Sequence, residues 1–216
     1  MNRKNSFFAY ARQALVMTLS LLLLCGLAYP VLLSAISAVI FPEQAKGSII
    51  EQDGKAVGAT FVGQEFTEDY FMKGRPSAYH YNTYTEDKDG NQFYNDGTEY
   101  AGLSSGSNNY APSNPALAER VEADIDAFLK KNPTISREDI PTDLMTASGS
   151  GLDPHISPDA AMIQIPAIAK SSGISQDELR EIVRQNTTGR LAGVFGEPVV
   201  NVLGVNCDIK AAMDAK

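Results

Sequence analysis

The hydrophobic and polar positions divide the chain into two unequal parts. Residues 13–42 form one uncharged and mostly apolar run, whereas polar and charged residues are interspersed throughout the remainder. A helix of about 20 apolar residues crosses the roughly 30 Å hydrocarbon core of a bilayer, so this run is long enough with some to spare. The pattern predicts one transmembrane helix over residues 13–42. Pro30 lies within it and should kink the helix, which is tolerated where neighbouring helices or waters satisfy the freed carbonyl.

The charges beside this run predict its orientation. Arg3, Lys4 and Arg12 precede it, and the first acidic residue is Glu43. Because short basic flanks stay in the cytoplasm, we expect residues 1–12 to form a cytoplasmic tail and residues 43–216 to form an extracytoplasmic domain. A cleaved signal peptide, with a cleavage site near residues 35–37, is the alternative. The apolar stretches of signal peptides are typically 7–15 residues long, about half the length seen here, which favours a retained single-pass anchor.

Shorter patterns predict the elements of the domain. Residues 47–52 and 55–63 are expected to form two strands joined by a turn at Asp53 and Gly54, a favoured hairpin pair. Residues 64–112 are rich in Tyr, Asn, Asp, Gly and Ser and lack periodicity, so they are expected to form a long, functional loop region.

Three helices and a last strand follow the loop region. The helix starts are marked by Asn114, by Ser157 and by the Ser175–Glu178 capping box, and Pro166 should interrupt the second helix. Residues 198–205 are apolar and β-branched and predict a strand, with a short helix over residues 207–214. The fold class expected is α+β, a transmembrane helix followed by one mixed α/β domain whose first and last strands share a sheet.

Charge and cysteine content exclude some partners. All 26 acidic residues but only 15 of the 18 basic ones follow residue 42, so the domain carries a formal charge of −11. Such a surface disfavours nucleic acid as a partner and disfavours anionic lipid beyond the lipid around the anchor. Cys25 lies inside the apolar run and Cys207 near the C-terminus, so no disulfide is expected.

The motifs that suggest catalysis or metal binding lack their usual context. Residues 102–106 match G-x-S-x-G, but polar loop replaces the strand and helix that a nucleophile elbow requires. Residues 87–91 match half of a calcium loop without its flanking helices or its final Glu, and a solvated turn is favoured. No zinc spacing is present. The residues alone therefore predict a non-catalytic subunit or binding module without a metal site.

Several segments, in order and spacing, resemble one family: KdpC, the C subunit of the bacterial high-affinity potassium-transporting P-type ATPase. The resemblance covers nearly the whole chain, although the acidic stretch around residues 86–97 is longer than is usual in the family. The segments that carry it are Gly63-Gln64, residues 71–78 (FMKGRPSA), 106–109 (GSNN), 112–115 (PSNP), 146–158 (TASGSGLDPHISP), Ala160-Ala161 with Gln164, and 200–203 (VNVL).

This resemblance implies an accessory subunit of the bacterial inner membrane that is needed for assembly. Its implied partners are a potassium-channel-like subunit, a P-type ATP-hydrolysing subunit and a small stabilising subunit. The family is described as a catalytic chaperone that raises the ATP affinity of the hydrolytic subunit. No tightly bound cofactor is implied, and involvement of ATP through the complex is possible. Because ATP binds on the cytoplasmic side, we expect the coupling to be indirect.

Candidate site residues follow from the resemblance and from position. Ser148, Gly149, Ser150, Gly151 and Gln164 are the candidates for nucleotide-linked behaviour. Arg75, Asn108 and Asn109 are candidates for contacts near the ion entrance or with a partner, although Arg75 could equally shape its own loop. In the anchor, Gly26, Pro30, Ser34 and Ser37 could allow close packing against a partner helix.

A free-standing, membrane-tethered ligand-binding domain is the alternative function. In that case the aromatic loop of residues 79–110 would bind a sugar, a peptide or a cation.

Overall fold

The computed structural model describes residues 3–52 and 54–215, which fall into two compact units. The N-terminal unit comprises residues 1–49 and the C-terminal unit residues 50–216. The predicted class, a long apolar helix followed by a mixed α/β domain, is confirmed.

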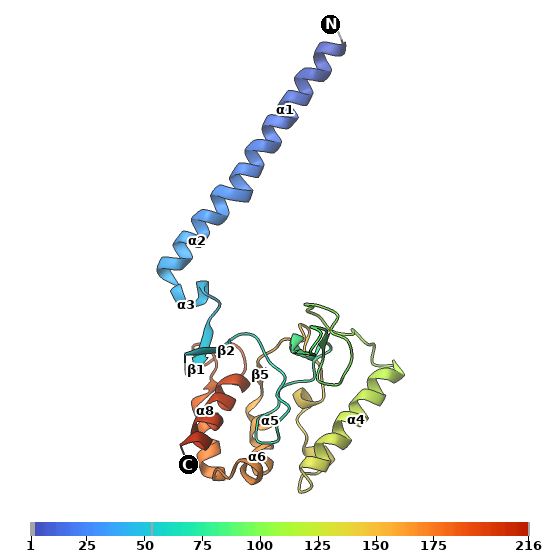
Figure 1. The fold of residues 1–216 in the computed structure, drawn as a ribbon, viewed down its shortest axis with the longest axis vertical. Coiled ribbons are helices and arrows are strands. Elements are labelled where there is room, and N and C mark those ends of the chain that lie inside the picture. Colours follow the sequence, from blue (N-terminus) through green and yellow to red (C-terminus); the bar gives the residue numbers. More distant parts are fainter. Residues whose placement is uncertain (1–2, 53, 216) are drawn as a thin grey trace. The chain divides into compact units, whose positions relative to one another are not determined.

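The N-terminal unit is a nearly continuous helix (Figure 1). It consists of α1 (Arg3–Leu23), a π-helical turn η1 (Leu24–Ala28), α2 (Tyr29–Ile40) and the short α3 (Pro42–Ala45). Residues 7–40 are long and apolar enough to cross a membrane, and none of their most apolar window is buried. Pro30 has no N–H to donate, and the turn just before it widens: the Tyr29 N–H bonds to the Leu24 carbonyl, five residues back.

Three small sheets lie in the part of the chain described. β1 (Ile49–Gln52) pairs with β2 (Lys55–Ala59), which confirms the predicted pairing with shorter strands, while Asp53 of the predicted turn lies outside the described residues. β3 (Thr85–Glu86) pairs with β4 (Gln92–Phe93) inside the region predicted to be loop. β7 (Val199–Asn201) lies between β5 (His155–Ile156) and β6 (Thr187–Thr188), antiparallel to both. The expectation that the first and last strands share a sheet is therefore wrong.

The predicted helices form with their predicted caps. They are α4 (Pro115–Lys131), α5 (Pro158–Met162), α6 (Ile165–Ser172) and α7 (Gln176–Gln185). The side chains of Asn114, Ser157 and Ser175 each accept a first-turn backbone N–H. The break between α5 and α6 falls just before Pro166, as expected. Three 3₁₀ turns, η2 (His80–Asn82), η3 (Arg137–Asp139) and η4 (Thr142–Leu144), complete the element list.

The last element differs from its prediction. Residues 202–205 were expected to extend a strand, but they begin α8 (Val202–Asp214), which also absorbs the short helix expected over residues 207–214. Asn201 ends β7 and caps α8 by accepting the N–H of Gly204 at 2.9 Å. Helical spacing buries Val202, Val205 and Ile209 on one face, and this burial outweighs the β preference of valine.

One hydrophobic core lies between the three-stranded sheet and the helices α5 to α8. It includes Ile156, Ile165, Leu179, Val200 and Ile209, each nearly inaccessible to solvent. Helix α4 adds Ile125, with Val121 and Phe128 packed against the cluster. Within residues 60–114 only Gly63, Met72 and Tyr94 are buried, so polar contacts hold most of this segment.

Candidate functional site

Three segments that carry the family resemblance meet in space. Ser77 Oγ donates to the Gly151 carbonyl at 2.7 Å, and the Gly106 N–H donates to the Ser150 carbonyl at 2.7 Å. These contacts join residues 75–82, 104–109 and 146–153, which we call the loop cluster. Residues up to 78 positions apart in sequence are therefore held at one place on the C-terminal unit.

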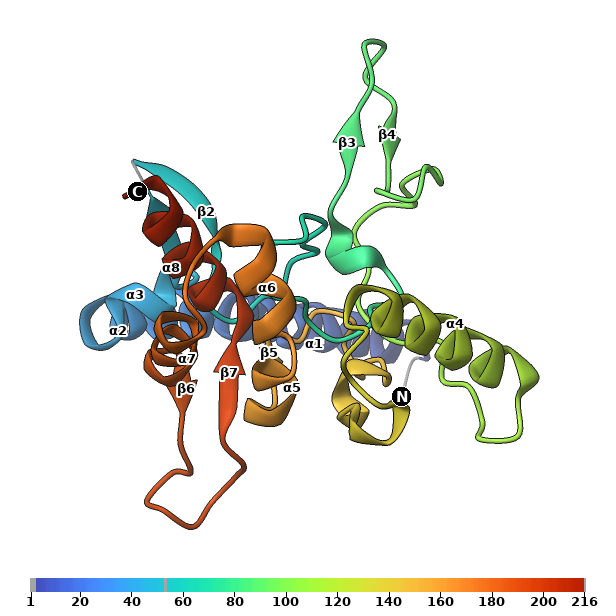
Figure 2. The same ribbon diagram turned by 90° about the horizontal axis from the view of Figure 1, so that it is seen from below.

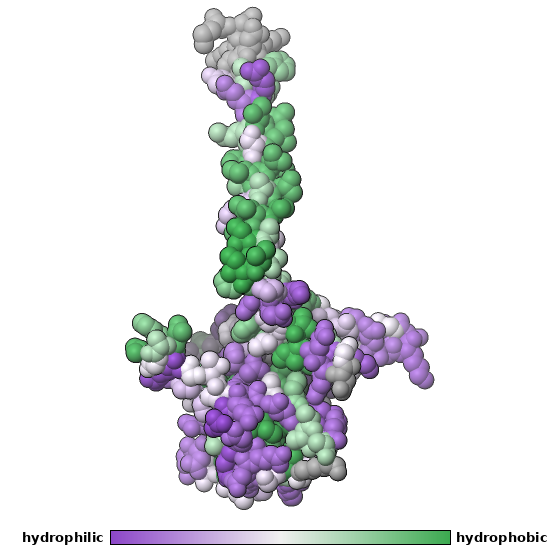
Figure 3. Space-filling view, turned by 90° about the vertical axis from the view of Figure 1, so that its left-hand side faces the viewer, coloured by the Kyte–Doolittle hydropathy of each residue, from purple (hydrophilic) through white to green (hydrophobic). Residues whose placement is uncertain are grey.

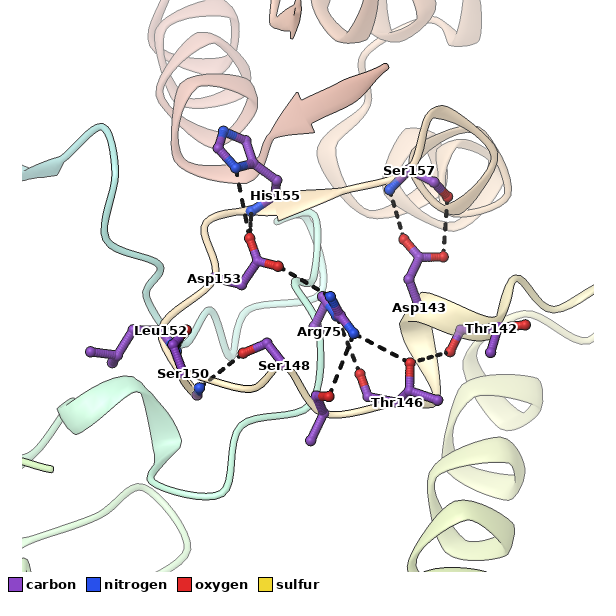
Figure 4. Close-up of polar contacts among 12 residues, drawn as sticks. Arg75, Thr142, Asp143, Thr146, Ser148, Ser150, Leu152, Asp153, His155 and Ser157 are labelled. Atoms are coloured by element: carbon purple, nitrogen blue, oxygen red, sulfur yellow. Dashed lines mark hydrogen bonds and ion pairs between the residues drawn. The ribbon is translucent and has the colours of Figure 1, made fainter. Parts of the chain in front are cut away.

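Arg75 lies at the centre of the loop cluster (Figure 4). Its Nη1 is 3.1 Å from Asp153 Oδ2, and its Nε donates to the Thr146 carbonyl at 3.3 Å. Nη2 makes longer contacts with Thr146 Oγ1 and the Ala147 carbonyl. Of the two roles left open for Arg75, the structure shows the shaping of its own unit, since one guanidinium spans both ends of the 146–153 loop.

Residues 148–151 form a tight turn. The Ser148 side chain is buried, and its Oγ accepts the Gly151 N–H at 2.9 Å. Gly151 has a φ of +68°, and a Cβ there would stand 2.8 Å from the Gly106 carbonyl oxygen. Gly149 and Ser150 are exposed. A glycine at 151 is thus required both by backbone conformation and by the close approach of a second loop.

Gln164 is buried and fully engaged within the unit. It is 4% exposed; Oε1 accepts the Lys73 N–H at 2.9 Å, and Nε2 donates to the carbonyls of Lys73 and Ala160 at 3.2 and 2.9 Å. Asn206 is 2% exposed and holds the backbone of Met72 through the same pair of bonds. Its side chain accepts the Met72 N–H at 2.7 Å and donates to the Met72 carbonyl at 2.9 Å. We call this pair the carboxamide clamp.

Sequence reasoning missed Asn206. A polar residue on the buried face of an otherwise apolar helix is the only local signal for it, and the segment that it holds lies 134 residues away. The nucleotide-linked role assigned to residues 148–151 and Gln164 remains a prediction. In the structure, Ser148 and Gln164 form hydrogen bonds within the C-terminal unit and stabilise its fold.

The loop cluster contains a left-handed turn at residues 80–82. His80, Tyr81 and Asn82 all have positive φ, from 47° to 56°, which is rare for residues with side chains. Ser77 Oγ accepts the N–H groups of Tyr79 and Tyr81, and the Asn82 side chain pairs with the backbone of Ser104. The Tyr81 hydroxyl donates to the Arg75 carbonyl at 2.7 Å, and burial raises the pKa of this phenol to about 12. The neighbouring contacts therefore compensate for local backbone strain.

The two asparagines proposed for the ion entrance lie at the rim of the loop cluster. Asn108 and Asn109 are exposed, and Asn109 Oδ1 accepts the Ser107 hydroxyl at 3.0 Å. Asn109 also has a φ of +49°. Their side chains can reach a partner, and a contact with one remains a prediction.

A cleft of about 940 Å³ opens beside the clamp, within the C-terminal unit. Lys73 lies in its wall, and its Nζ donates to the carbonyls of Phe66 and Glu68 at 2.6 Å each. Burial lowers the pKa of this amine to about 8, with a smaller effect from the nearby Lys131. The wall also contains Gln164, Arg75, Tyr81, Phe128, Lys131 and Lys170.

The acidic stretch forms the β3–β4 hairpin. At its tip, the Asn91 side chain donates to Asp87 Oδ2 at 2.8 Å, and this bond is the largest cause of the lowered pKa of the carboxyl. Asp87 Oδ1 also accepts the backbone N–H groups of Asn91 and Asp89, which lower that pKa further. The carboxylate closes a solvated turn, as predicted. Over residues 3–52 and 54–215, no group of three or more His, Cys, Asp or Glu side chains is placed to hold a metal ion.

The packing candidates of the anchor occupy two parts of the helix. Gly26 lies in the π-helical turn, and Pro30 follows at the start of α2. Ser34 and Ser37 line a hollow of about 420 Å³ with Ala38, Pro42 and Lys46. Contact of this surface with a partner helix remains a prediction.

Comparison with known proteins places the chain. A family model described as "KdpC: K+-transporting ATPase, c chain" matches residues 11–211. The potassium-transporting ATPase KdpC subunit of Clostridium kluyveri is 59% identical over 95% of this chain and 95% of its own length. The subunits of the same name from Clostridioides difficile and Rhodopseudomonas palustris strain BisB18 are 55% and 45% identical, covering 92% and 93% of this chain and 95% and 97% of their own lengths. The chain therefore belongs to the KdpC family, the C subunit of the potassium-transporting ATPase.

Proposed function

We propose that this chain acts from the extracytoplasmic side of the inner membrane and raises the ATP affinity of the ATP-hydrolysing subunit indirectly. It would bind one conformation of the ATPase preferentially and so increase the population of that conformation. The observation that carries the proposal is the engagement of Gln164, whose side chain hydrogen-bonds to the backbone of Lys73 and Ala160 in the same chain. A side chain that holds the fold together acts on ATP through the shape of the unit.

Charge placement supports an extracytoplasmic position. Three basic residues and no acidic residue precede the apolar run, and the 26 acidic residues all follow it. By the positive-inside rule, the C-terminal unit lies across the bilayer from cytoplasmic ATP. A preference of about 1.4 kcal/mol for one pump conformation changes an apparent affinity tenfold, so a modest contact is sufficient.

We assign two surfaces to the partner subunits. The apolar helix of residues 7–40, with its π-helical turn and small residues, would pack against a transmembrane helix of a partner. The rim of the loop cluster, with Asn108, Asn109 and the 86%-exposed Leu103, would face the channel-like subunit near its potassium entrance. Arg75 and the clamp give this rim a fixed shape.

The test compares the purified ATPase with and without this chain. We expect removal of the chain to raise the KM for ATP in potassium-dependent hydrolysis, and removal of residues 1–42 to abolish co-purification. Hydrolysis with unchanged KM and rate after removal would contradict the proposal. Topology is checked with Gly90→Cys in a chain lacking Cys25 and Cys207: a membrane-impermeant maleimide should label it from outside in intact cells.

The alternative function, a ligand-binding domain, would use the cleft in place of the aromatic loop of residues 79–110. Lys73, Lys131 and Lys170 in its wall, beside Phe128, would attract an anionic organic ligand. Carboxylates also line the cleft, and one of them, Asp69, pairs with Lys131 at 2.6 Å. ATP at millimolar concentration is the probe to use, with thermal unfolding of the full chain as the readout. A rise in the unfolding temperature that Lys170→Gln removes would favour direct binding over indirect coupling. An unchanged unfolding temperature supports the indirect route.

A further inference from the structure

The connection between β6 and β7 is an ordered projection. Leu191 and Phe195 exchange backbone hydrogen bonds at 2.8 and 3.0 Å, with a tight turn of positive φ at Ala192 and Gly193 between them. Behind this pair, Arg190 Nη2 lies 2.8 Å from Glu197 Oε2. We call residues 189–198 the arm. In Figure 2 it projects from one side of the C-terminal unit, opposite to the β3–β4 hairpin.

The tip of the arm is apolar and exposed. Leu191, Val194 and Phe195 are 75%, 71% and 68% exposed, and none of them belongs to the core of the unit. A small apolar lobe accordingly stands out from the largely polar unit in Figure 3. Three large apolar side chains gathered on one projection do nothing for the fold, and such patches typically mark interaction sites.

We propose that the arm is a docking element whose tip enters an apolar recess of another protein subunit of the ATPase. The inference rests on the proposed function only in assuming that the chain assembles with the other subunits. It adds a third contact, separate from the transmembrane helix and from the rim of the loop cluster. Arm and loop cluster belong to different segments of the C-terminal unit, so the two contacts can be tested independently.

The charge of the C-terminal unit favours a recess of another subunit over a lipid bilayer or a second copy of this chain as the binding partner of the arm. The residues after 42 carry a formal charge of −11, which repels both an anionic bilayer and a second copy of the same acidic unit. On the arm, by contrast, the charges of Arg190 and Glu197 compensate each other, and the three tip side chains are uncharged. The arm can therefore enter a partner without burying an unpaired charge.

The first test removes the apolar tip in the full chain co-expressed with the other subunits. The variant carries Leu191→Ser, Val194→Ser and Phe195→Ser. We expect its recovery with the purified ATPase to fall about tenfold or more, because a few central apolar side chains dominate most interfaces. Its thermal unfolding in detergent should match that of the parent chain. The control, Arg190→Gln with Glu197→Gln, keeps the tip and should assemble normally.

The second test identifies the occupant. A photoreactive p-benzoylphenylalanine replaces Phe195 in the assembled ATPase, and the cross-linked products are identified by mass spectrometry. A cross-link to another subunit supports the proposal. Cross-links only to lipid or to a second copy of this chain overturn it, as do normal recovery of the triple variant and the absence of any cross-link in an intact complex. Failure of the unmodified chain to co-purify would instead count against the proposed function itself.

Discussion

Two segments of the C-terminal unit are built in opposite ways. Residues 72–82 lie against the core and are held by polar side chains: the buried carboxamide clamp and the partly buried Arg75 and Ser77. The arm has almost the reverse composition, with large apolar side chains exposed at its tip and a charged pair behind them. Of the polar groups that the resemblance singled out, Gln164, Arg75 and Ser148 hold the fold. The exposed apolar side chains of the arm tip, which no motif marked, lie outside the core.

The largest expected effect comes from breaking the clamp at Asn206. Asn206→Ala leaves the buried N–H and carbonyl of Met72 without their partner, which costs about 2–4 kcal/mol of unfolding free energy. Urea unfolding, followed by the near-ultraviolet circular dichroism of the tyrosines, measures this cost. Asn109→Ala, at an exposed amide, is the matched control and should change stability by less than about 0.5 kcal/mol. Equal stabilities of the two variants would contradict the clamp.

Gly151→Ala should have the next largest effect. An alanine at a φ of +68° is strained, and its Cβ would collide with the Gly106 carbonyl oxygen, so we expect a loss of about 1–3 kcal/mol. Gly149→Ala, two residues away, meets nothing within 4 Å and should be nearly neutral. Similar unfolding midpoints for both variants would show that the two loops do not pack as described.

Substitution of Arg75 distinguishes a role in packing the loop cluster from a role in binding a partner subunit. Arg75→Ala should lower stability by about 1–2 kcal/mol, since a half-buried guanidinium loses Asp153 and the Thr146 carbonyl. Arg75→Lys should recover only part of this, because an ammonium cannot reach both ends of the loop at once. A variant of unchanged stability but impaired assembly would reassign Arg75 to a partner contact.

Lys73 predicts a pH dependence. Its folded pKa of about 8 lies below the 10.5 of an ordinary lysine, so the unfolded chain binds more protons between these values. Stability from this group is therefore constant below pH 8 and rises towards pH 10.5, by less than about 1 kcal/mol, since the amine is half-exposed and its carbonyl partners oppose the shift. Unfolding at pH 8 and pH 10 should show this rise in the parent chain and not in Lys73→Met. Above pH 10, Tyr81 acts in the opposite sense, because its raised pKa favours the folded state only while the phenol stays protonated.

The smallest expected effect is on the arm. Phe195→Ser alone should change the unfolding free energy by less than about 0.5 kcal/mol, as it removes a side chain that is 68% exposed. A loss above about 1.5 kcal/mol in the same urea titration would mean that the tip packs against its own unit, and would erase the contrast with the clamp.

Local signals predicted local structure well. The helix starts were predicted correctly from the caps at Asn114, Ser157 and Ser175, and the break in the second helix from Pro166. Each of these signals depends only on residues within one helical turn. Residues 202–205 were predicted as a strand because β-branched residues prefer strands. In the folded unit, burial of these side chains on one face of α8 outweighs that preference, and this burial is determined by the assembled core. The two partners of β7 and the hydrogen bonds between Asn206 and Met72 join distant segments, and a local sequence pattern does not encode them. The exposure of the arm tip was equally invisible, since its composition resembles that of a core strand.

The π-helical turn before Pro30 determines which side chains of the anchor face a neighbouring helix. A wide turn inserts about one residue into the helical register, which rotates every later side chain by about 100° relative to a straight helix. Gly26 and the pair Ser34 and Ser37 therefore do not follow one 3.6-residue stripe. Disulfide cross-linking scanned along residues 13–40, against a fixed cysteine series on a partner helix, should show a periodic signal whose phase jumps between residues 24 and 30.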